Sequence, residues 1–134
     1  MSASSPASKT NRPLSPHLQI YKLIPTMAMS IVHRITGAAL YFGTLLVAWW
    51  LIAAASGPGY FDFVSGFFGS WFGILVLFGY TWALIHHMLG GLRHFVWDMG
   101  YLFEKHTATR LAYATITASV ALTLVIWIVG AVAR

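Results

Sequence analysis

A cluster of histidines and glycines stands near the end of the second of three long apolar segments. It reads His86-His87-Met88-Leu89-Gly90-Gly91-Leu92-Arg93-His94. Imidazoles inside a membrane helix are costly, so they usually bind, relay or pair with something. On a helix, His87, Gly91 and His94 share one face, because Gly91 and His94 follow His87 by four and seven residues. This face carries a bare position between two imidazoles and could hold a flat macrocycle.

We predict that His87 ligates the iron of such a macrocycle and that Gly91 lets a porphyrin edge approach. His86 points about 100° away around the helix, so only one of the two adjacent imidazoles can face an iron. His94 lies about 10 Å further along the axis, too far to share a metal ion with His87. The structural alternative is a histidine that only hydrogen-bonds a neighbouring helix, with Gly91 allowing close helix packing.

A second axial ligand would have to come from elsewhere. It could be His33 of the first apolar segment or a histidine of another chain, and we expect His33 to be too shallow in the membrane. For His94 the sequence favours binding of a propionate or a proton-relay role, with a plain interfacial histidine as the alternative.

Ser30-Ile31-Val32-His33-Arg34 forms a second cluster. Ser30, His33 and Arg34 lie three and four residues apart, on one side of a helix. An arginine in a span costs a few kcal/mol unless it snorkels or pairs, and snorkelling to lipid phosphate is the plain interpretation. With a hydroxyl and an imidazole beside it, Arg34 could instead hydrogen-bond a haem propionate or a quinone carbonyl.

The composition predicts an all-α integral membrane protein, because 58% of residues are hydrophobic and only 8% are charged. Residues 35–61, 63–92 and 111–133 contain no Asp, Glu, Lys or Arg. Each stretch exceeds the roughly 20 residues that a spanning helix needs. We expect spans near residues 29–54, 65–97 and 109–132, and a helix bundle completed by a partner subunit, since three helices enclose little space.

Residues 1–23 contain three prolines and five serines, and no long apolar run. They are predicted to form an N-terminal arm, with no cleaved signal peptide. Residues 24–134 would then form a three-helix membrane anchor domain.

The distribution of basic residues predicts the orientation in the membrane. Lys9, Arg12 and Lys22 precede the first span and Lys105 and Arg110 lie in the second connection. By the positive-inside rule the N-terminus lies in the cytoplasm or matrix and the C-terminus outside. The Ser30 to Arg34 cluster and the run from His87 to Asp98 are then expected at the same membrane surface.

The net charge of +5 and the absence of cysteine exclude several classes of site. Because the basic residues flank the spans, anionic lipid headgroups explain the charge better than nucleic acid does. Without cysteine the chain has no iron-sulfur cluster of its own, no thioether-linked haem and no disulfide.

Three segments together resemble the cytochrome b556 subunits of succinate dehydrogenase, the large membrane anchors of respiratory complex II. The segments are Arg12-Pro13-Leu14-Ser15-Pro16-His17-Leu18-Gln19-Ile20-Tyr21, Ser30-Ile31-Val32-His33-Arg34-Ile35-Thr36-Gly37 and His87-Met88-Leu89-Gly90-Gly91-Leu92-Arg93-His94-Phe95-Val96-Trp97-Asp98. The resemblance covers about residues 11–134. His86 departs from relatives that carry tyrosine there, and its role is left open.

The resemblance implies that His87 is the axial ligand of haem b, with the second ligand supplied by the small membrane-anchor subunit. It implies that His33, Arg34 and His94 lie near the haem propionates and that Ser30 and Arg34 line the ubiquinone site. Succinate would be oxidised on a flavoprotein subunit, and electrons would reach ubiquinone through an iron-sulfur subunit. The chain would lie in a bacterial cytoplasmic or mitochondrial inner membrane and would not be an enzyme alone.

Three alternative functions are compatible with the sequence. The chain could anchor a quinol:fumarate reductase that runs the reverse reaction, or be a structural anchor without haem. It could also be a small transporter or proton channel that uses His87, His94 and Asp98 as a relay.

Overall fold

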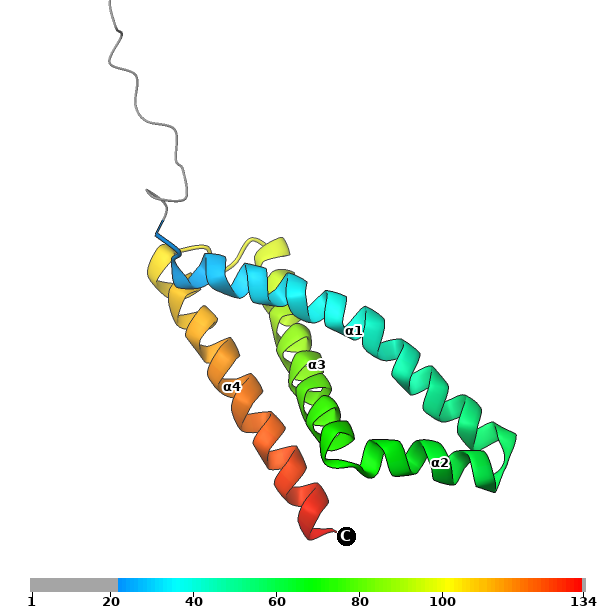
Figure 1. Ribbon diagram of the computed structural model, residues 1–134. Coiled ribbons are helices and arrows are strands. Elements are labelled where there is room, and N and C mark those ends of the chain that lie inside the picture. Colours follow the sequence, from blue (N-terminus) through cyan, green and yellow to red (C-terminus); the bar gives the residue numbers. More distant parts are fainter. Residues whose placement is uncertain (1–21, 134) are drawn as a thin grey trace, which may run out of the picture.

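Four helices account for nearly all of the chain that the structure describes, which is residues 22–133 of a computed structural model. They are α1 (Pro25–Ser56), α2 (Pro58–Gly69), α3 (Trp71–Asp98) and α4 (Lys105–Val132) (Figure 1). No strand occurs within those residues. The all-α prediction is therefore confirmed.

The helix boundaries follow from local chemistry. Prolines, whose missing N–H costs nothing in a first turn, begin α1 and α2. Gly57 joins these two helices at a φ of 112°, a backbone conformation that suits glycine. At the start of α3 the Ser70 hydroxyl accepts a hydrogen bond of 3.1 Å from the Gly73 amide.

The carboxylate of Glu104 caps the start of α4. It accepts hydrogen bonds from the amides of His106 at 3.0 Å and Thr107 at 2.8 Å. These bonds favour the ionised form and lower the pKa of Glu104 to about 2. Because this pKa is below its ordinary value, the stabilising effect of the cap is complete above about pH 4.5 and is lost as the pH falls toward 2.

Helices α1, α3 and α4 are long and apolar enough to cross a membrane, with mean hydropathies of 1.8, 1.5 and 2.2 over their most apolar windows. The three predicted spans are therefore present. The start predicted for the second span, residue 65, is wrong, because residues 65–69 belong to α2 and α3 begins at Trp71. The break between α2 and α3 was not predicted, because it occurs at Ser70, an uncharged residue within a long apolar stretch.

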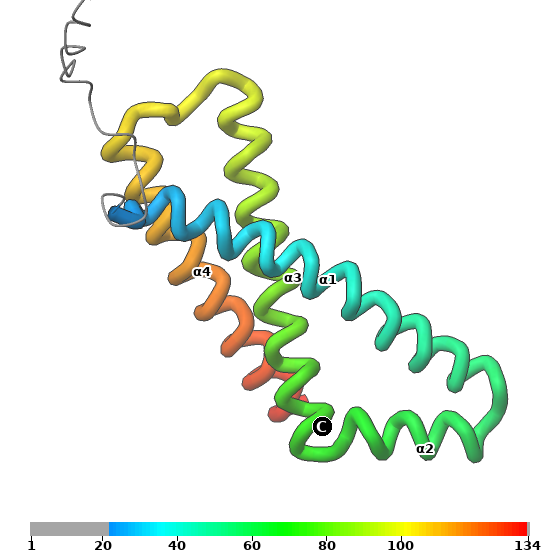
Figure 2. Tube along the Cα trace, turned by 45° about the horizontal axis from the view of Figure 1, so that its top comes forward, coloured from blue at the N-terminus to red at the C-terminus, as the bar shows by residue number. Residues whose placement is uncertain are grey.

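The helix α2 is too short to be a span. Its 12 residues extend about 18 Å, against a hydrocarbon core of about 30 Å. Figures 1 and 2 show that α1 leans away from α3 toward its C-terminal end and that α2 bridges the resulting space. The starts of α1 and α4 and the end of α3 lie together at the opposite end of the molecule.

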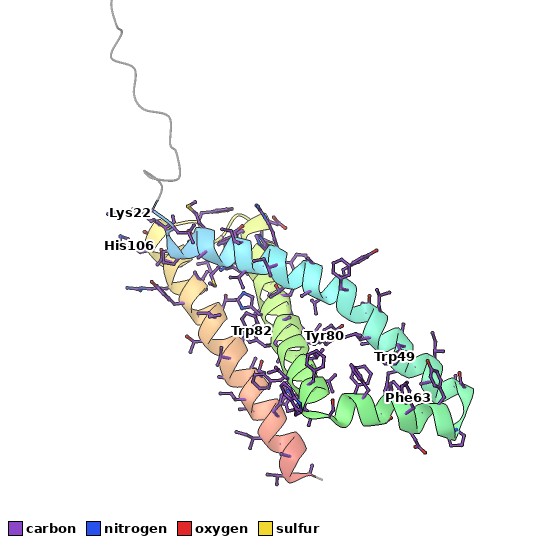
Figure 3. All side chains as sticks on the ribbon, in the orientation of Figure 1. Lys22, Trp49, Phe63, Tyr80, Trp82 and His106 are labelled. Carbon is purple, nitrogen blue, oxygen red and sulfur yellow. The ribbon has the colours of Figure 1, made fainter. Side chains whose placement is uncertain are left out.

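The spanning helices pack mainly through small side chains. Glycine, alanine, serine and threonine supply most of the buried positions, as is usual where membrane helices approach closely. The buried small residues are Thr36, Gly43, Ala53, Gly73, Ala83, Gly90, Ala112, Thr115, Ser119 and Thr123. In Figure 3 Tyr80 points from α3 toward α1, and Trp82 lies on the side of α3 that faces α4.

Most large apolar side chains remain exposed on the outer faces of the helices. Their number fits a chain that is surrounded by lipid and by a partner subunit. The predicted N-terminal arm, residues 1–23, lies outside the described residues except for Lys22 and Leu23, so its boundary stays a prediction.

Substitution of Gly73 by alanine should break the corner between α2 and α3. The added Cβ would lie 2.6 Å from the Phe68 Cα and 2.7 Å from the Phe68 carbonyl oxygen, which are backbone atoms that cannot move aside. We expect a loss of about 1–3 kcal/mol in the free energy of unfolding, measured by denaturant titration in mixed micelles.

Gly69→Ala is the matched control, because a Cβ there meets nothing within 4 Å. It should be neutral, or stabilising by up to about 1 kcal/mol through helix propensity. Equal unfolding free energies for the two variants would contradict the packing described for this corner.

Candidate functional site

The imidazole of His87 is held between α3 and α1 by a backbone carbonyl. Its Nδ1 lies 3.0 Å from the His33 carbonyl oxygen and 3.4 Å from the Thr36 hydroxyl oxygen. A carbonyl oxygen can only accept, so Nδ1 carries the proton and donates. The ring packs on Gly37, where an added Cβ would lie 2.9 Å from His87 Cε1. The small residues Thr36 and Gly37 thus admit the histidine against α1.

This arrangement leaves Nε2 of His87 with a free lone pair. No hydrogen bond engages Nε2 within residues 22–133. Histidines that bind a metal usually donate their other ring N–H to a carbonyl or carboxylate, which fixes the tautomer and the ring. His87 therefore fits an axial ligand to haem iron, with Nε2 as the ligating atom.

His33 occupies the space between His87 and His94 that the sequence left empty. Its ring stacks on His87, with centroids 4.0 Å apart and planes 2° apart, and lies 5.2 Å from the ring of His94. The ring also rests on Gly90, where an added Cβ would overlap His33 Nδ1. The predicted convergence of the two histidine clusters is confirmed for His33, His87 and His94.

The two glycines of the cluster therefore have different surroundings. Gly90 is buried beneath His33, whereas an added Cβ at Gly91 would meet nothing within 4 Å. Gly91 as the place where a porphyrin edge approaches stays a prediction.

The stacked geometry excludes His33 as the partner of His87 on one iron. Two imidazoles that bind one iron from opposite sides would each direct a nitrogen at the metal, so their rings would not lie face to face in contact. The expectation that His33 is too shallow in the membrane stays a prediction, since its ring lies between those of His87 and His94 and rests on Gly90, three residues beyond His87 on α3. What excludes His33 is the orientation of its ring.

His86 faces the opposite neighbour, α4. It is 1% exposed, and its Nδ1 lies 3.1 Å from the Ser119 hydroxyl oxygen. Ser119 donates its own proton to the Ile116 carbonyl at 2.8 Å, so His86 Nδ1–H is the donor toward Ser119. The expectation that the adjacent imidazoles point in different directions is confirmed, whereas Ser119 was not predicted as the partner of His86.

The other predicted residues of the first helix lie less centrally. Ser30 is half-buried and Arg34 is exposed on α1, and Asp98 is exposed at the end of α3. An exposed arginine near His33 is free to bind a group that reaches α1 from outside the chain. The assignments of Ser30, Arg34 and His94 to a ligand stay predictions.

Sequence reasoning gave no role to Arg93 and Trp97. Arg93 is 6% exposed, and its guanidinium lies over the Trp97 ring at 4.9 Å from the centroid. The spacing could have predicted that they share a helix face. Arg93 follows Gly90 by three residues and Trp97 follows Arg93 by four, so the three positions lie on the same side of α3. No cluster of three metal-ligating side chains occurs among the described residues.

The tautomer of His87 is testable by ¹⁵N NMR of histidine-labelled protein in bilayers. We expect the proton on Nδ1, because the His33 carbonyl accepts from it. His106, exposed at the start of α4, serves as the solvent reference. A signal from protonated Nε2 and bare Nδ1 would contradict the described hydrogen bond.

The sequence matches a known family and named relatives over most of its length. Residues 8–126 match the family described as succinate dehydrogenase/fumarate reductase transmembrane subunit. The succinate dehydrogenase cytochrome b556 subunit of Paracoccus denitrificans is 46% identical over 89% of this chain and 92% of its own. That of Rickettsia felis is 37% identical over 87% and 91% of the two chains.

A plant relative extends this similarity. The succinate dehydrogenase cytochrome b560 subunit of Marchantia polymorpha is 42% identical over 72% of this chain and 74% of its own. Three span-length helices with paired histidine clusters at one end, together with these matches, lead to one conclusion: the chain belongs to the family of transmembrane subunits of succinate dehydrogenase and fumarate reductase.

Proposed function

We propose that the chain is the membrane anchor of a succinate dehydrogenase, that it holds haem b through His87 and that it forms part of the site where ubiquinone is reduced. The observation that carries the proposal is the hydrogen bond from His87 Nδ1 to the His33 carbonyl at 3.0 Å, because it orients the ring and keeps Nε2 available. The names of the relatives, cytochrome b556 and b560 subunits, support the haem.

The haem would supply a one-electron centre within the membrane. On this chain, His87 binds the iron and His33 holds the imidazole of His87 by its carbonyl and by ring stacking. His33, Arg34 and His94 provide donors for the propionates. A second ligand would come from the small membrane-anchor subunit, as the resemblance to the cytochrome b556 subunits implies, and the stacked ring of His33 would not supply it.

The quinone site would use Ser30 and Arg34 of α1. Both are within four residues of His33, and Arg34 is exposed on the outer side of α1, where a quinone between subunits could reach it. Directed hydrogen bonds from a hydroxyl and a guanidinium hold the quinone carbonyl and stabilise the negative charge that develops on it during reduction. Such bonds are most effective where water is excluded.

The flavoprotein and iron-sulfur subunits would complete the pathway from succinate to this site. They would bind at the end of the molecule where α1 and α4 begin, because the positive-inside rule favours the cytoplasm or matrix for the basic residues around this end. The N-terminus then lies inside and the C-terminus outside, in a bacterial cytoplasmic or mitochondrial inner membrane. We propose succinate oxidation as the physiological direction because the relatives are named succinate dehydrogenase subunits.

Replacing His87 by alanine should remove the b-type haem spectrum of the assembled complex, because Nε2 is the ligand that this chain offers. The reduced-minus-oxidised difference spectrum of the purified complex measures this. His106→Ala is the control, since His106 is exposed at the start of α4 and should leave the spectrum unchanged. An intact spectrum in a fully assembled His87→Ala complex would refute ligation by His87.

Replacing Arg34 by leucine should lower ubiquinone reduction by about tenfold or more, since a hydrogen bond from a charged group contributes about 1.5–3 kcal/mol. Succinate oxidation with an artificial acceptor should stay intact, because the flavin is on another subunit. Arg110→Leu removes another exposed arginine, at the start of α4, and should affect neither rate. Equal losses of both activities in Arg34→Leu would show that the quinone assignment is wrong.

A further inference from the structure

The guanidinium of Arg93 is buried without a hydrogen-bond partner on two of its three nitrogens. Arg93 is 6% exposed, and neither Nε nor Nη1 has an acceptor among residues 22–133. Its one described contact with a π system is the Trp97 ring at 4.9 Å. A cation–π contact alone does not replace the hydrogen bonds that a guanidinium has in water.

Snorkelling to lipid does not explain Arg93. A snorkelling arginine keeps its charged head in water or among headgroups, as the exposed Arg34 can. In Arg93 the nitrogens Nε and Nη1 are themselves covered by protein. A second donor beside it also lacks an acceptor among the described residues, because Nε1 of Trp97 is buried without a hydrogen-bond partner. Since arginine and tryptophan nitrogens can only donate, this location lacks an acceptor.

The chain contains no acid that can supply this acceptor. It has only three acidic residues, which are Asp62, Asp98 and Glu104. Asp62 lies in α2 at the far end of the molecule, and the Glu104 carboxylate is bound to the start of α4. Asp98 is exposed and makes no hydrogen bond to Nε or Nη1 of Arg93. A side-chain carboxylate for Arg93 therefore has to come from outside the chain.

We propose that Arg93 binds a carboxylate from outside the chain and that this carboxylate is a propionate of haem b. Arg93 is six residues beyond His87 on α3, which is about 9 Å of rise toward the end where the polar groups gather. Trp97 links it to the histidine cluster, since the rings of His94 and Trp97 are 5.3 Å apart and His94 contacts His33. The choice of haem as the source rests on the proposed function, whereas the need for a carboxylate does not.

The test is infrared spectroscopy of the complex with haem that carries ¹³C at its propionate carboxylates, introduced by feeding labelled aminolaevulinate. Arg93→Met should shift the labelled carboxylate stretch and weaken haem binding about tenfold, since the lost bond is charge-assisted. Arg93→Lys, which keeps the charge but not the planar fork, should give an intermediate shift and guards against loss of assembly. Arg110→Met, at an exposed position of α4, should shift nothing.

Two outcomes would overturn the proposal. A shift confined to unlabelled carboxylate bands would assign the carboxylate to a partner subunit and reject the propionate. Unchanged carboxylate bands in both Arg93 variants would show that Arg93 binds no carboxylate. Absence of haem from the wild-type complex would instead refute the proposed function, and the unlabelled bands would still report on Arg93.

Discussion

The arrangement of the polar end depends on one hydrogen bond between helices, from His87 Nδ1 to the main-chain oxygen of His33. A main-chain acceptor ties α3 to α1 in a way that no substitution at position 33 can remove directly. It sets the tautomer, the ring plane and the helix against which the ring packs. The bond also requires close helix approach, which Thr36 and Gly37 allow by their small size.

The two adjacent histidines divide their contacts between the neighbours of α3. His87 is held by α1, and His86 is held by Ser119 of α4. A rotation of α3 about its axis would disturb both contacts together, because the two side chains are about 100° apart. The orientation of the proposed ligand is thus determined from both sides of its helix.

Much of the fold could be predicted from the sequence because the bilayer imposes simple rules. Length and apolar composition were enough to find three spans, and the basic residues were enough to expect the two histidine clusters at the same end. The helix α2 was missed, since Ser70 and Gly73 end one apolar helix and begin another with no change in hydropathy. The position of the His33 ring between His87 and His94 could not be predicted, because it depends on how α1 crosses α3.

The site was predictable where it depended on residue type and unpredictable where it depended on neighbours. The sequence identified His87 and the separation of His86 from it, both of which follow from helical geometry. The sequence could not predict that His33 packs on Gly90, that His86 hydrogen-bonds Ser119 or that Arg93 is buried. These contacts depend on how the three long helices are rotated relative to one another. The motif indicates which side chains could do chemistry, and helix packing determines which of their atoms have no hydrogen-bond partner.

The hydroxyls on the buried face of α4 have a consequence for how this chain is put together in the membrane. Thr115, Ser119 and Thr123 all return their protons to carbonyls of α4 itself, so they leave the alignment of α4 along α3 unspecified. Among residues 22–133 the His86 contact is the single side-chain hydrogen bond between these two helices. Because Thr115 and Thr123 lie one helical turn on either side of Ser119, a slide of α4 by one turn would bring another hydroxyl oxygen opposite the imidazole. This hydrogen bond therefore limits α4 to steps of whole turns along α3 and leaves the choice among them to side-chain packing.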